Sequence, residues 1–264
     1  MDLQLHHKRA LVTGSSSGIG FATAVALARE GAQVILNGRS AQRVEHARER
    51  LLALVPQAQV QGMAADLATM DGIQKLVVAH PDVDILVNNL GIFEPKAFEN
   101  ITDTDWLQMF NVNVMSGVRL ARAYLPAMKQ RNWGRIVFVS SESGANIPVE
   151  MVHYGMSKAA QLAVSRGIAE DTAGTGVTCN SVLPGPTMTE GVGDFFASLA
   201  TEQGVDLAEA QRRFFTEARP SSLLKRFIDP AEVANLITYV CSPLSAATNG
   251  AALRVDGGIV RSII

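Results

Sequence analysis

The sequence predicts an α/β fold in which one doubly wound parallel sheet of about seven strands carries helices on both faces. Short runs of β-branched and aliphatic residues alternate with longer amphipathic segments along the whole chain, which is the pattern of repeated β-α-β units. No repeat, linker or low-complexity stretch divides the 264 residues, and 47% of them are hydrophobic. We therefore expect residues 1–264 to form a single domain around one core.

The strand candidates are the short apolar runs, and helical periodicity fills the segments between them. They cover residues 10–13, 33–36, 59–63, 85–87, 135–139, 177–180 and 252–255. Near-continuous Val, Ile and Leu is typical of strands that are buried on both faces. The clearest helices are predicted over 21–29, 105–129 and 154–172. Ligands of such sheets bind beyond the carboxyl ends of the strands, so a functional site is expected at that edge.

One segment, residues 189–226, interrupts the alternation of strand and helix. It contains three glycines, two short amphipathic patterns and two phenylalanine pairs, Phe195-Phe196 and Phe214-Phe215. An excursion longer than the usual loop between helix and strand often covers a site, so we predict a lid. The alternative is a pair of ordinary surface helices that bury the phenylalanines.

The composition narrows the classes of partner. The chain has 23 basic and 25 acidic residues, for a formal net charge of -2, and no run of Lys or Arg that would indicate a nucleic-acid or membrane surface. Its apolar runs are far shorter than a membrane span, and no charged-then-apolar leader opens it, so we expect a cytoplasmic protein. Cys179 and Cys241 lack metal-ligand spacing and are expected to be reduced, with no metal bound.

The first predicted strand runs directly into a glycine-rich turn, residues 13–20, and a helix follows. Backbone N–H groups at a helix N-terminus attract phosphate, and glycines let the backbone approach it closely. The spacing of Gly14, Gly18 and Gly20 is Gly-x-x-x-Gly-x-Gly, which differs from the Gly-x-Gly-x-x-Gly of many other dinucleotide-binding proteins. We predict a dinucleotide site here, with a purely structural turn as the alternative.

The end of the second predicted strand bears on which dinucleotide binds. NAD-binding proteins place an acidic residue there for the ribose 2′-hydroxyl, whereas an arginine suits the 2′-phosphate of NADP. This chain reads Asn37-Gly38-Arg39-Ser40 and has no acid at that point. Arg39 therefore favours NADP(H) over NAD(H), unless it is an ordinary solvated loop residue.

Tyr154, Lys158 and Ser141 form a candidate catalytic group. Tyr154 and Lys158 are four residues apart on a predicted helix and share a face, so we expect the ammonium to lower the pKa of the phenol. Ser141 lies 13 residues ahead of the tyrosine in a Ser-Ser-Glu-Ser-Gly turn, where its hydroxyl could hold a carbonyl oxygen or cap local backbone. A Tyr-x-x-x-Lys pair alone can arise by chance, so the other motifs decide its meaning.

With these motifs in this order, the chain resembles the short-chain dehydrogenases/reductases over nearly its whole length. Asp66 resembles the family's acid on the adenine side, and Asn113 matches the asparagine of its catalytic tetrad. The segments 88–91, 184–189 and 255–258 resemble the family's Asn-Asn-Ala-Gly, nicotinamide-carboxamide and C-terminal motifs. The chain differs from the family pattern at two positions: Leu90 replaces a small residue, and Ser116 stands where a glycine is common. These differences are expected to affect the shape of the cofactor site and leave the catalytic groups in place.

The resemblance implies a Rossmann-type fold and hydride transfer between a nicotinamide and a carbonyl or secondary alcohol. It assigns proton donation to Tyr154, carbonyl binding to Ser141, ribose binding and tuning of the tyrosine to Lys158, and a proton-relay water to Asn113. With the local chemistry it assigns cofactor contacts to Gly14, Ser16, Ser17, Gly18, Ile19, Gly20, Arg39, Asp66, Leu67, Asn89, Gly91, Tyr154, Lys158, Pro184, Gly185, Thr187 and Thr189.

Residues around the catalytic turn are expected to border the substrate, together with Phe93 and the lid. They are Glu142, Ser143, Asn146, Met151 and His153. Arg212, Arg213 and Arg219 of the lid could attract an anionic substrate, but we favour a solvated helix face. The substrate, whether a keto-acyl compound, a keto acid or another ketone, stays open.

Other functional classes remain as alternatives. An NAD-dependent alcohol dehydrogenase and a non-catalytic NAD(P)-binding sensor or scaffold would share the fold. A nucleotide-sugar epimerase would share the Tyr and Lys pair but is expected to have a further substrate domain. By resemblance, the helices over 105–129 and 154–172 pair with a second subunit, and we expect a homotetramer.

Overall fold

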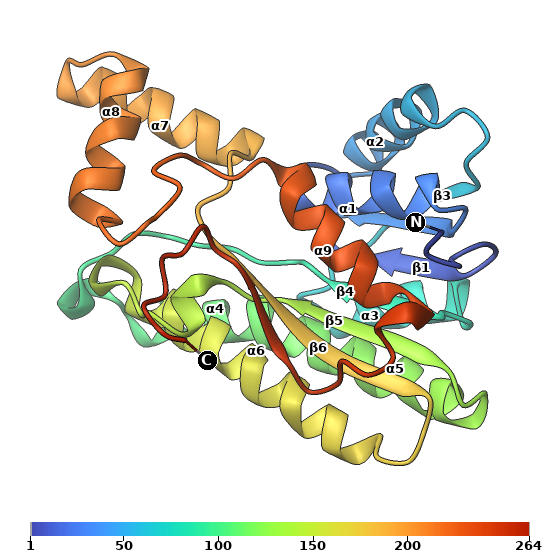
Figure 1. The fold of residues 1–264 in the computed structure, drawn as a ribbon. Helices are drawn as coiled ribbons and strands as arrows, with labels where there is room; N and C mark the ends of the chain where they lie inside the picture. The colour runs from blue at the N-terminus through green and yellow to red at the C-terminus, as the bar shows by residue number, and fades with distance from the viewer. Residues whose placement is uncertain (1, 264) are drawn as a thin grey trace.

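The computed structural model describes residues 2–263 and contains one seven-stranded sheet in the order β3-β2-β1-β4-β5-β6-β7, with every neighbouring pair parallel (Figure 1). The strands are β1 (Arg9–Val12), β2 (Gln33–Gly38), β3 (Val60–Ala64), β4 (Ile85–Asn88), β5 (Gly134–Val139), β6 (Val177–Pro184) and β7 (Ala252–Val255). The predicted doubly wound fold and its seven strands are confirmed.

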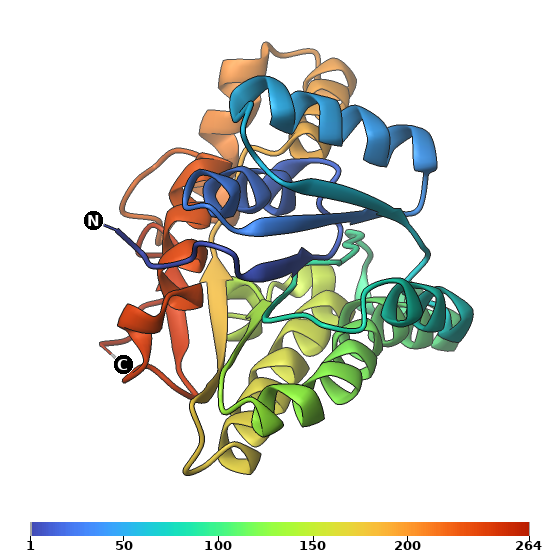
Figure 2. The ribbon, with the colours of Figure 1, turned by 90° about the vertical axis from the view of Figure 1, so that its right-hand side faces the viewer.

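Helices cover both faces of the sheet and make three layers (Figures 1 and 2). On one face lie α1 (Gly18–Arg29), α2 (Ala41–Leu54) and α9 (Pro230–Cys241); on the other lie α3 (Met70–Ala79), α5 (Ser116–Gln130) and α6 (Val152–Asp171). Successive side chains of β1 divide between the two cores, since Ala10 and Val12 join the first and Leu11 joins the second. Alternation along the strands thus produces two apolar cores from near-continuous apolar runs.

The order of the strands reverses beside β1. The chain passes from β1 to β2 and β3 on one side and then crosses over to β4 on the other. Connections that diverge at such a point leave a crevice beyond the carboxyl ends of the strands. At this point the register pairs Val12 of β1 with Leu36 of β2 and with Val87 of β4, so these strands end close to one level.

The helix predicted over 105–129 is divided in the structure. It comprises α4 (Asp103–Phe110), a π-helical turn η2 (Asn111–Met115) and α5, in unbroken succession. A π turn inserts one residue into the helical repeat and is frequent at functional sites. Asn113 lies inside this turn. The turn could not be predicted from the sequence, because a search for apolar residues at the 3.6-residue period of an α-helix does not distinguish it from ordinary helix.

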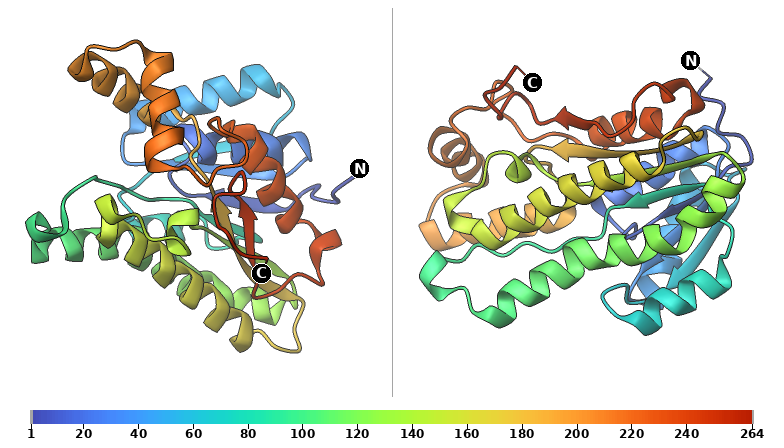
Figure 3. Two further views of the ribbon diagram at one scale, coloured as in Figure 1. Left: turned by 60° about the vertical axis from the view of Figure 1, so that its left-hand side comes forward. Right: turned by 90° about the horizontal axis from the view of Figure 1, so that it is seen from below.

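The segment 189–226 stands away from the sheet, beyond the carboxyl ends of the strands (Figures 1 and 3). It forms α7 (Glu190–Gln203), α8 (Leu207–Arg213) and a π turn η5 (Phe214–Ala218). Phe196 and Phe215 are buried, and the ring centroid of Phe227 lies 5.0 Å from that of each. The segment thus buries most of its phenylalanines in a small core of its own, while Phe195 stays 41% exposed.

The short remaining elements are single turns at loop positions. They are η1 (Phe98–Asn100), η3 (Glu142–Gly144), η4 (Val149–Met151) and η6 (Pro243–Ser245). Cys179 and Cys241 are buried free thiols. Within residues 2–263, no helix combines the length and the apolar character that crossing a membrane requires.

Candidate active site

Ser141 and Tyr154 meet at one cavity, beyond the carboxyl ends of β5 and β6. Ser141 follows β5 and caps η3, and Tyr154 lies in the first turn of α6. Both line a cavity of about 450 Å³, which we call the catalytic cavity. Phenylalanines of α7 and η5 form part of its wall, so the segment 189–226 covers it. The 13-residue offset in sequence thus becomes a shared site in space.

Burial dominates the acidity of Tyr154. Removal from water raises the pKa of the phenol to about 12 and is the largest effect. The negative charge of Glu142 raises this pKa further, whereas a hydrogen bond with Ser141 and the positive charge of Arg219 lower it. The predicted lowering of this pKa by Lys158 is wrong for this structure. The Lys158 ammonium lies 5.6 Å from the centroid of the phenol ring, and the cost of ionising a phenol that has lost most of its water prevails.

Lys158 is itself buried, with 4% of its surface exposed. Its Nζ donates to the carbonyl of Val139 at 3.0 Å and to Oε1 of Gln161 at 3.3 Å. Burial lowers the pKa of this ammonium to about 7. Loss of water therefore moves the pKa values of the two neighbouring groups in opposite directions, upward for the phenol and downward for the ammonium.

The side chain of Asn113 is held entirely by protein groups. Its Nδ2 donates to the Ile92 carbonyl and to Ser157 Oγ, both at 2.9 Å, and its Oδ1 accepts from the Ile92 N–H at 2.8 Å. The main-chain carbonyl of Asn113 accepts from Gln161 Nε2 at 2.6 Å. Asn113 thus reaches Lys158 through Gln161 and joins η2 to α6.

Part of the predicted cofactor set lines a second cavity, of about 600 Å³, which we call the nucleotide cavity. Of the predicted residues, Gly14, Ser16, Ser17, Arg39, Leu67, Asn89 and Gly91 line it. Ile19, Pro184, Gly185, Thr187 and Thr189 line the catalytic cavity instead, as does Tyr154. Gly18, Gly20, Asp66 and Lys158 line neither one. Asp66 is exposed, and its carboxylate accepts from the Ala68 N–H at 3.1 Å.

The glycine turn leaves no room for side chains. A Cβ on Gly20 would lie 2.5 Å from Asn89 Nδ2 and 2.6 Å from the Gly14 carbonyl oxygen. Gly14 and Gly18 have φ values of +59° and +57°, which strongly favour glycine. The N-cap residue Ser17 makes no side-chain capping bond to α1. Close backbone, a helix N-terminus and nearby arginines fit a phosphorylated dinucleotide.

Two groups of the nucleotide cavity escaped the sequence prediction. Asn37 is buried at the end of β2, where its Nδ2 donates to the carbonyls of Met63 and Ala65 and its Oδ1 accepts from the Gly14 N–H. It therefore ties the glycine turn to the ends of β2 and β3. Arg43, in the first turn of α2, lines the cavity with Arg39. Both residues could have been predicted from the sequence: Asn37 is a polar residue at the end of an apolar strand, and Arg43 is a second arginine four residues after Arg39.

The segment 189–226 also touches the glycine turn. Oε2 of Glu190, the first residue of α7, accepts from the Gly18 N–H at 2.9 Å, and its Oε1 lies 3.8 Å from Arg50. Gly18 is the first residue of α1. A carboxylate of the segment therefore binds the helix end where a phosphate is expected.

Four of the predicted substrate-side residues line the catalytic cavity: Phe93, Glu142, Ser143 and Met151. Asn146 and His153 do not, so this part of the prediction is wrong. Asn146 is exposed beyond η3. His153 is fully buried against Trp106, with ring centroids 5.9 Å apart, because adjacent residues of a helix point in different directions and Tyr154 faces the cavity.

The expectation that Arg212, Arg213 and Arg219 form a solvated helix face is wrong for Arg219. Arg212 and Arg213 are exposed and pair with Glu209, as a solvated helix face requires. Arg219 is only 7% exposed and lines the catalytic cavity. Arg219 directly follows the π turn η5, and its guanidinium pairs with Glu142 and Glu150 in the cavity wall rather than pointing into solvent.

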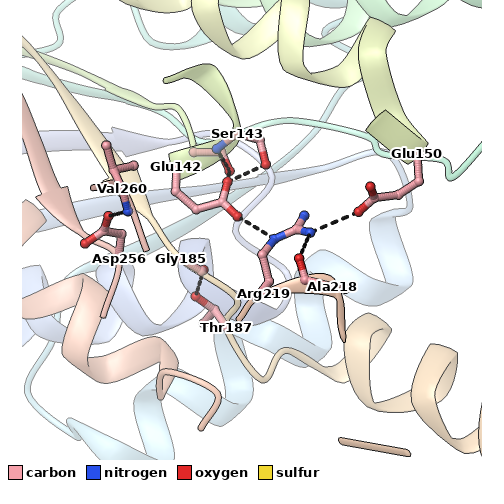
Figure 4. A network of polar contacts seen from close by, with 10 residues as sticks. Glu142, Ser143, Glu150, Gly185, Thr187, Ala218, Arg219, Asp256 and Val260 are labelled. Atoms are coloured by element: carbon pink, nitrogen blue, oxygen red, sulfur yellow. Dashed lines mark hydrogen bonds and ion pairs between the residues drawn. The ribbon is translucent and has the colours of Figure 1, made fainter. Parts of the chain in front are cut away.

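Figure 4 shows the polar network that Arg219 makes with two glutamates. Its Nε donates to Glu142 Oε1 at 3.1 Å, and its Nη1 donates to Glu150 Oε1 at 3.0 Å. Oε2 of Glu142 accepts from Ser141 Oγ at 3.2 Å and from the hydroxyl of Ser143. Glu142 thereby joins the segment 189–226 to the candidate catalytic serine.

Known proteins resemble the chain over its full length. The family model described as short chain dehydrogenase matches residues 8–199. The uncharacterized oxidoreductase YvaG of Bacillus subtilis is 49% identical, with all of both chains covered. A D-beta-hydroxybutyrate dehydrogenase of Cupriavidus necator is 33% identical, over 97% of this chain and 99% of that one.

Among solved structures, L-sorbose reductase from Gluconobacter frateurii, complexed with NADPH and L-sorbose, superposes with a TM-score of 0.93 at 31% identity, with all of both chains covered. The agreement thus extends from the glycine turn through the catalytic loop to the last strand. The chain belongs to the short-chain dehydrogenase/reductase family of oxidoreductases, which act on CH–OH and C=O groups.

Proposed function

We propose that this oxidoreductase is an NADP(H)-preferring carbonyl reductase in which Tyr154, Ser141, Lys158 and Asn113 form the catalytic group. One observation carries the proposal: Ser141 and Tyr154 line a single cavity whose wall includes the loop 184–189, and Glu190 at the end of that loop contacts the glycine turn. A substrate carbonyl in this cavity would lie between a hydroxyl donor pair and the predicted nicotinamide site.

When bound, the nicotinamide supplies the hydride that the carbonyl carbon accepts. The protein supplies the proton and the geometry. A phenol with a pKa of about 12 is protonated at neutral pH, so Tyr154 holds the proton that the carbonyl oxygen takes up as the alcohol forms. Ser141 donates a second hydrogen bond to that oxygen, for which its hydroxyl turns from Glu142 toward the cavity.

Lys158 and Asn113 act behind the reacting atoms. With a pKa of about 7, Lys158 both gains and loses protons near neutral pH, which suits replenishing the proton of Tyr154. A Cβ on Gly91 would lie 3.4 Å from Lys158 Nζ and 3.5 Å from Asn113 Oδ1, so this glycine keeps the space above both side chains open. That space suits the ribose hydroxyls that the family resemblance places against the lysine.

The preference for NADP(H) rests on Arg39 and Arg43. Both line the nucleotide cavity, and β2 ends in Asn37-Gly38 with no carboxylate. Two guanidinium groups suit a phosphate dianion better than a neutral hydroxyl. The structural resemblance to a sorbose reductase complexed with NADPH supports the same choice.

The segment 189–226 serves in this proposal as a lid shared by both cavities. Its first helix contacts Gly18 of the glycine turn, and Arg219 near its end contacts Glu142 of the catalytic turn. Binding of either ligand would therefore act on the same segment.

Replacing Tyr154 by Phe should abolish turnover and preserve cofactor binding, because only the proton donor is lost. The measurement is NADPH absorbance against a panel of ketones, keto acids, sugars and acetoacetyl thioesters, with fluorescence titration of NADPH as the control for folding. Wild-type turnover by Tyr154→Phe would refute the role. A wild-type protein that binds NADPH but reduces or oxidises nothing in the panel would instead be a non-catalytic sensor.

Replacing Arg39 by Ala should raise KM for NADPH about 10- to 100-fold, the equivalent of a lost charge-assisted hydrogen bond of about 1.5–3 kcal/mol. KM for NADH should change little, because NADH lacks the 2′-phosphate. Arg48→Ala is the matched control, since Arg48 lies on the same helix as Arg43 and pairs with Glu45 outside the cavity. Equal losses for both cofactors in Arg39→Ala would contradict the assignment.

Replacing Glu190 by Gln should tighten NADPH binding about threefold or more, because a carboxylate would no longer compete with phosphate at the N-terminus of α1. The effect is modest because the Glu190 side chain is 55% exposed. Dissociation constants from fluorescence titration measure it. Glu202→Gln, which removes an exposed charge near the end of the same helix, should leave the constant unchanged. Weaker binding in Glu190→Gln would count against competition.

Self-association is part of the proposal, with a homotetramer expected. α4 exposes Leu107 at 70% and Phe110 at 39%, and on α6 a Cβ at Gly167 would meet no atom within 4 Å. These features suit a partner helix packed closely against the same face. Sedimentation at micromolar concentration should give the mass of four chains; a stable monomer would overturn the expectation.

A further inference from the structure

Arg219 is the only basic side chain among the described residues that line the catalytic cavity. Its guanidinium donates to Glu142, to Glu150 and, at 2.9 Å, to the carbonyl of Ala218. It also lies over the ring of Phe214, with Cζ 5.6 Å from the centroid. Figure 4 shows this guanidinium between the two carboxylates. The cation of the cavity is therefore already engaged by groups of the protein.

The charges of this wall do not balance. Two carboxylates face one guanidinium, and the side chain of Glu142 is only 4% exposed. Lys158 does not line the cavity and donates to Val139 and Gln161 behind it. The cavity therefore presents an excess of negative charge beside the place where the carbonyl binds.

A substrate carboxylate would meet two obstacles in this cavity. Nε and Nη1 of Arg219 are already bonded to Glu142, Glu150 and the Ala218 carbonyl, so a carboxylate could approach only Nη2 unless it displaced one of these groups. Displacing the buried Glu142 from its partner would be strongly destabilising. Without such a displacement it would face the like charges of Glu142 and Glu150. A neutral carbonyl compound meets neither obstacle, and Phe93, Met151 and Val192 offer its carbon skeleton an apolar wall.

We propose that the catalytic cavity selects carbonyl substrates that carry no carboxylate, with Glu142, Glu150 and Arg219 as the residues that set this specificity. The inference rests on the proposed function, since it concerns the same cavity. It narrows the substrate class: uncharged ketones, hydroxyketones and keto esters are accepted, and free keto acids are rejected by charge rather than by size.

The test uses substrates that differ in one charge and share one carbonyl. Acetoacetate is compared with methyl acetoacetate, and levulinate with methyl levulinate, using NADPH and the wild-type chain, with Tyr154→Phe as the blank. We expect kcat/KM for each ester to exceed that for its acid at least about tenfold, the equivalent of about 1.4 kcal/mol. Acids used as well as their esters would overturn the charge inference and leave the reductase standing. Reduction of neither member, or reduction that survives in the blank, would overturn the proposed function and the inference with it.

Glu150→Gln tests the origin of the selection. Because this side chain is 41% exposed and partly screened, the ratio of kcat/KM for acid to that for ester should rise only about threefold, chiefly through a lower KM for the acid. Glu202→Gln removes the same charge outside the cavity and should leave the ratio at its wild-type value. The ratio is insensitive to the fraction of folded protein, so an equal ratio in the two variants would contradict the role of Glu150.

Discussion

The functional groups of this chain depend on the parallel sheet, which brings the carboxyl ends of all seven strands to one edge. The chain leaves β1 toward β2 and β3 and then crosses to β4 on the other side, and such a reversal leaves a crevice beyond the carboxyl ends of the strands. Because all the strands are parallel, the glycine turn after β1, Asn37 at the end of β2 and Ser141 after β5 reach the same edge. Segments more than 100 residues apart thereby contribute to one edge of the sheet.

Burial at that edge determines how the polar groups behave. Tyr154 and Lys158 both lose water, so the pKa of the phenol rises to about 12 and that of the ammonium falls to about 7. Asn113, which is also buried, avoids this cost by pairing with Ile92 and Ser157. Both ring nitrogens of the buried His153, by contrast, have no hydrogen-bond partner among the residues that the structure describes.

The segment 189–226 contacts both the glycine turn and the catalytic turn. Phe196, Phe214 and neighbouring apolar residues pack together in a small cluster apart from the two main cores. At one end Glu190 accepts from the Gly18 N–H, and at the other Arg219 donates to Glu142. Each of these contacts is made by a charged side chain.

The fold class, the seven strands and the order of the motifs could all be predicted from the sequence, because hydrophobic periodicity and glycine spacing are properties of the linear chain. The offset of 13 residues, read with the family resemblance, also predicted that Ser141 and Tyr154 act together. The remaining features depend on how distant segments pack against one another. Burial reversed the expected pKa shift of Tyr154, because desolvation depends on atoms from many segments. The rotation between adjacent helical residues turns His153 away from the cavity, and the ion pairs with Glu142 and Glu150 hold Arg219 in the cavity wall. These outcomes depend on the path of the chain in space, and pairings such as that of Arg219 with Glu142, 77 residues away, have no signal in either local sequence.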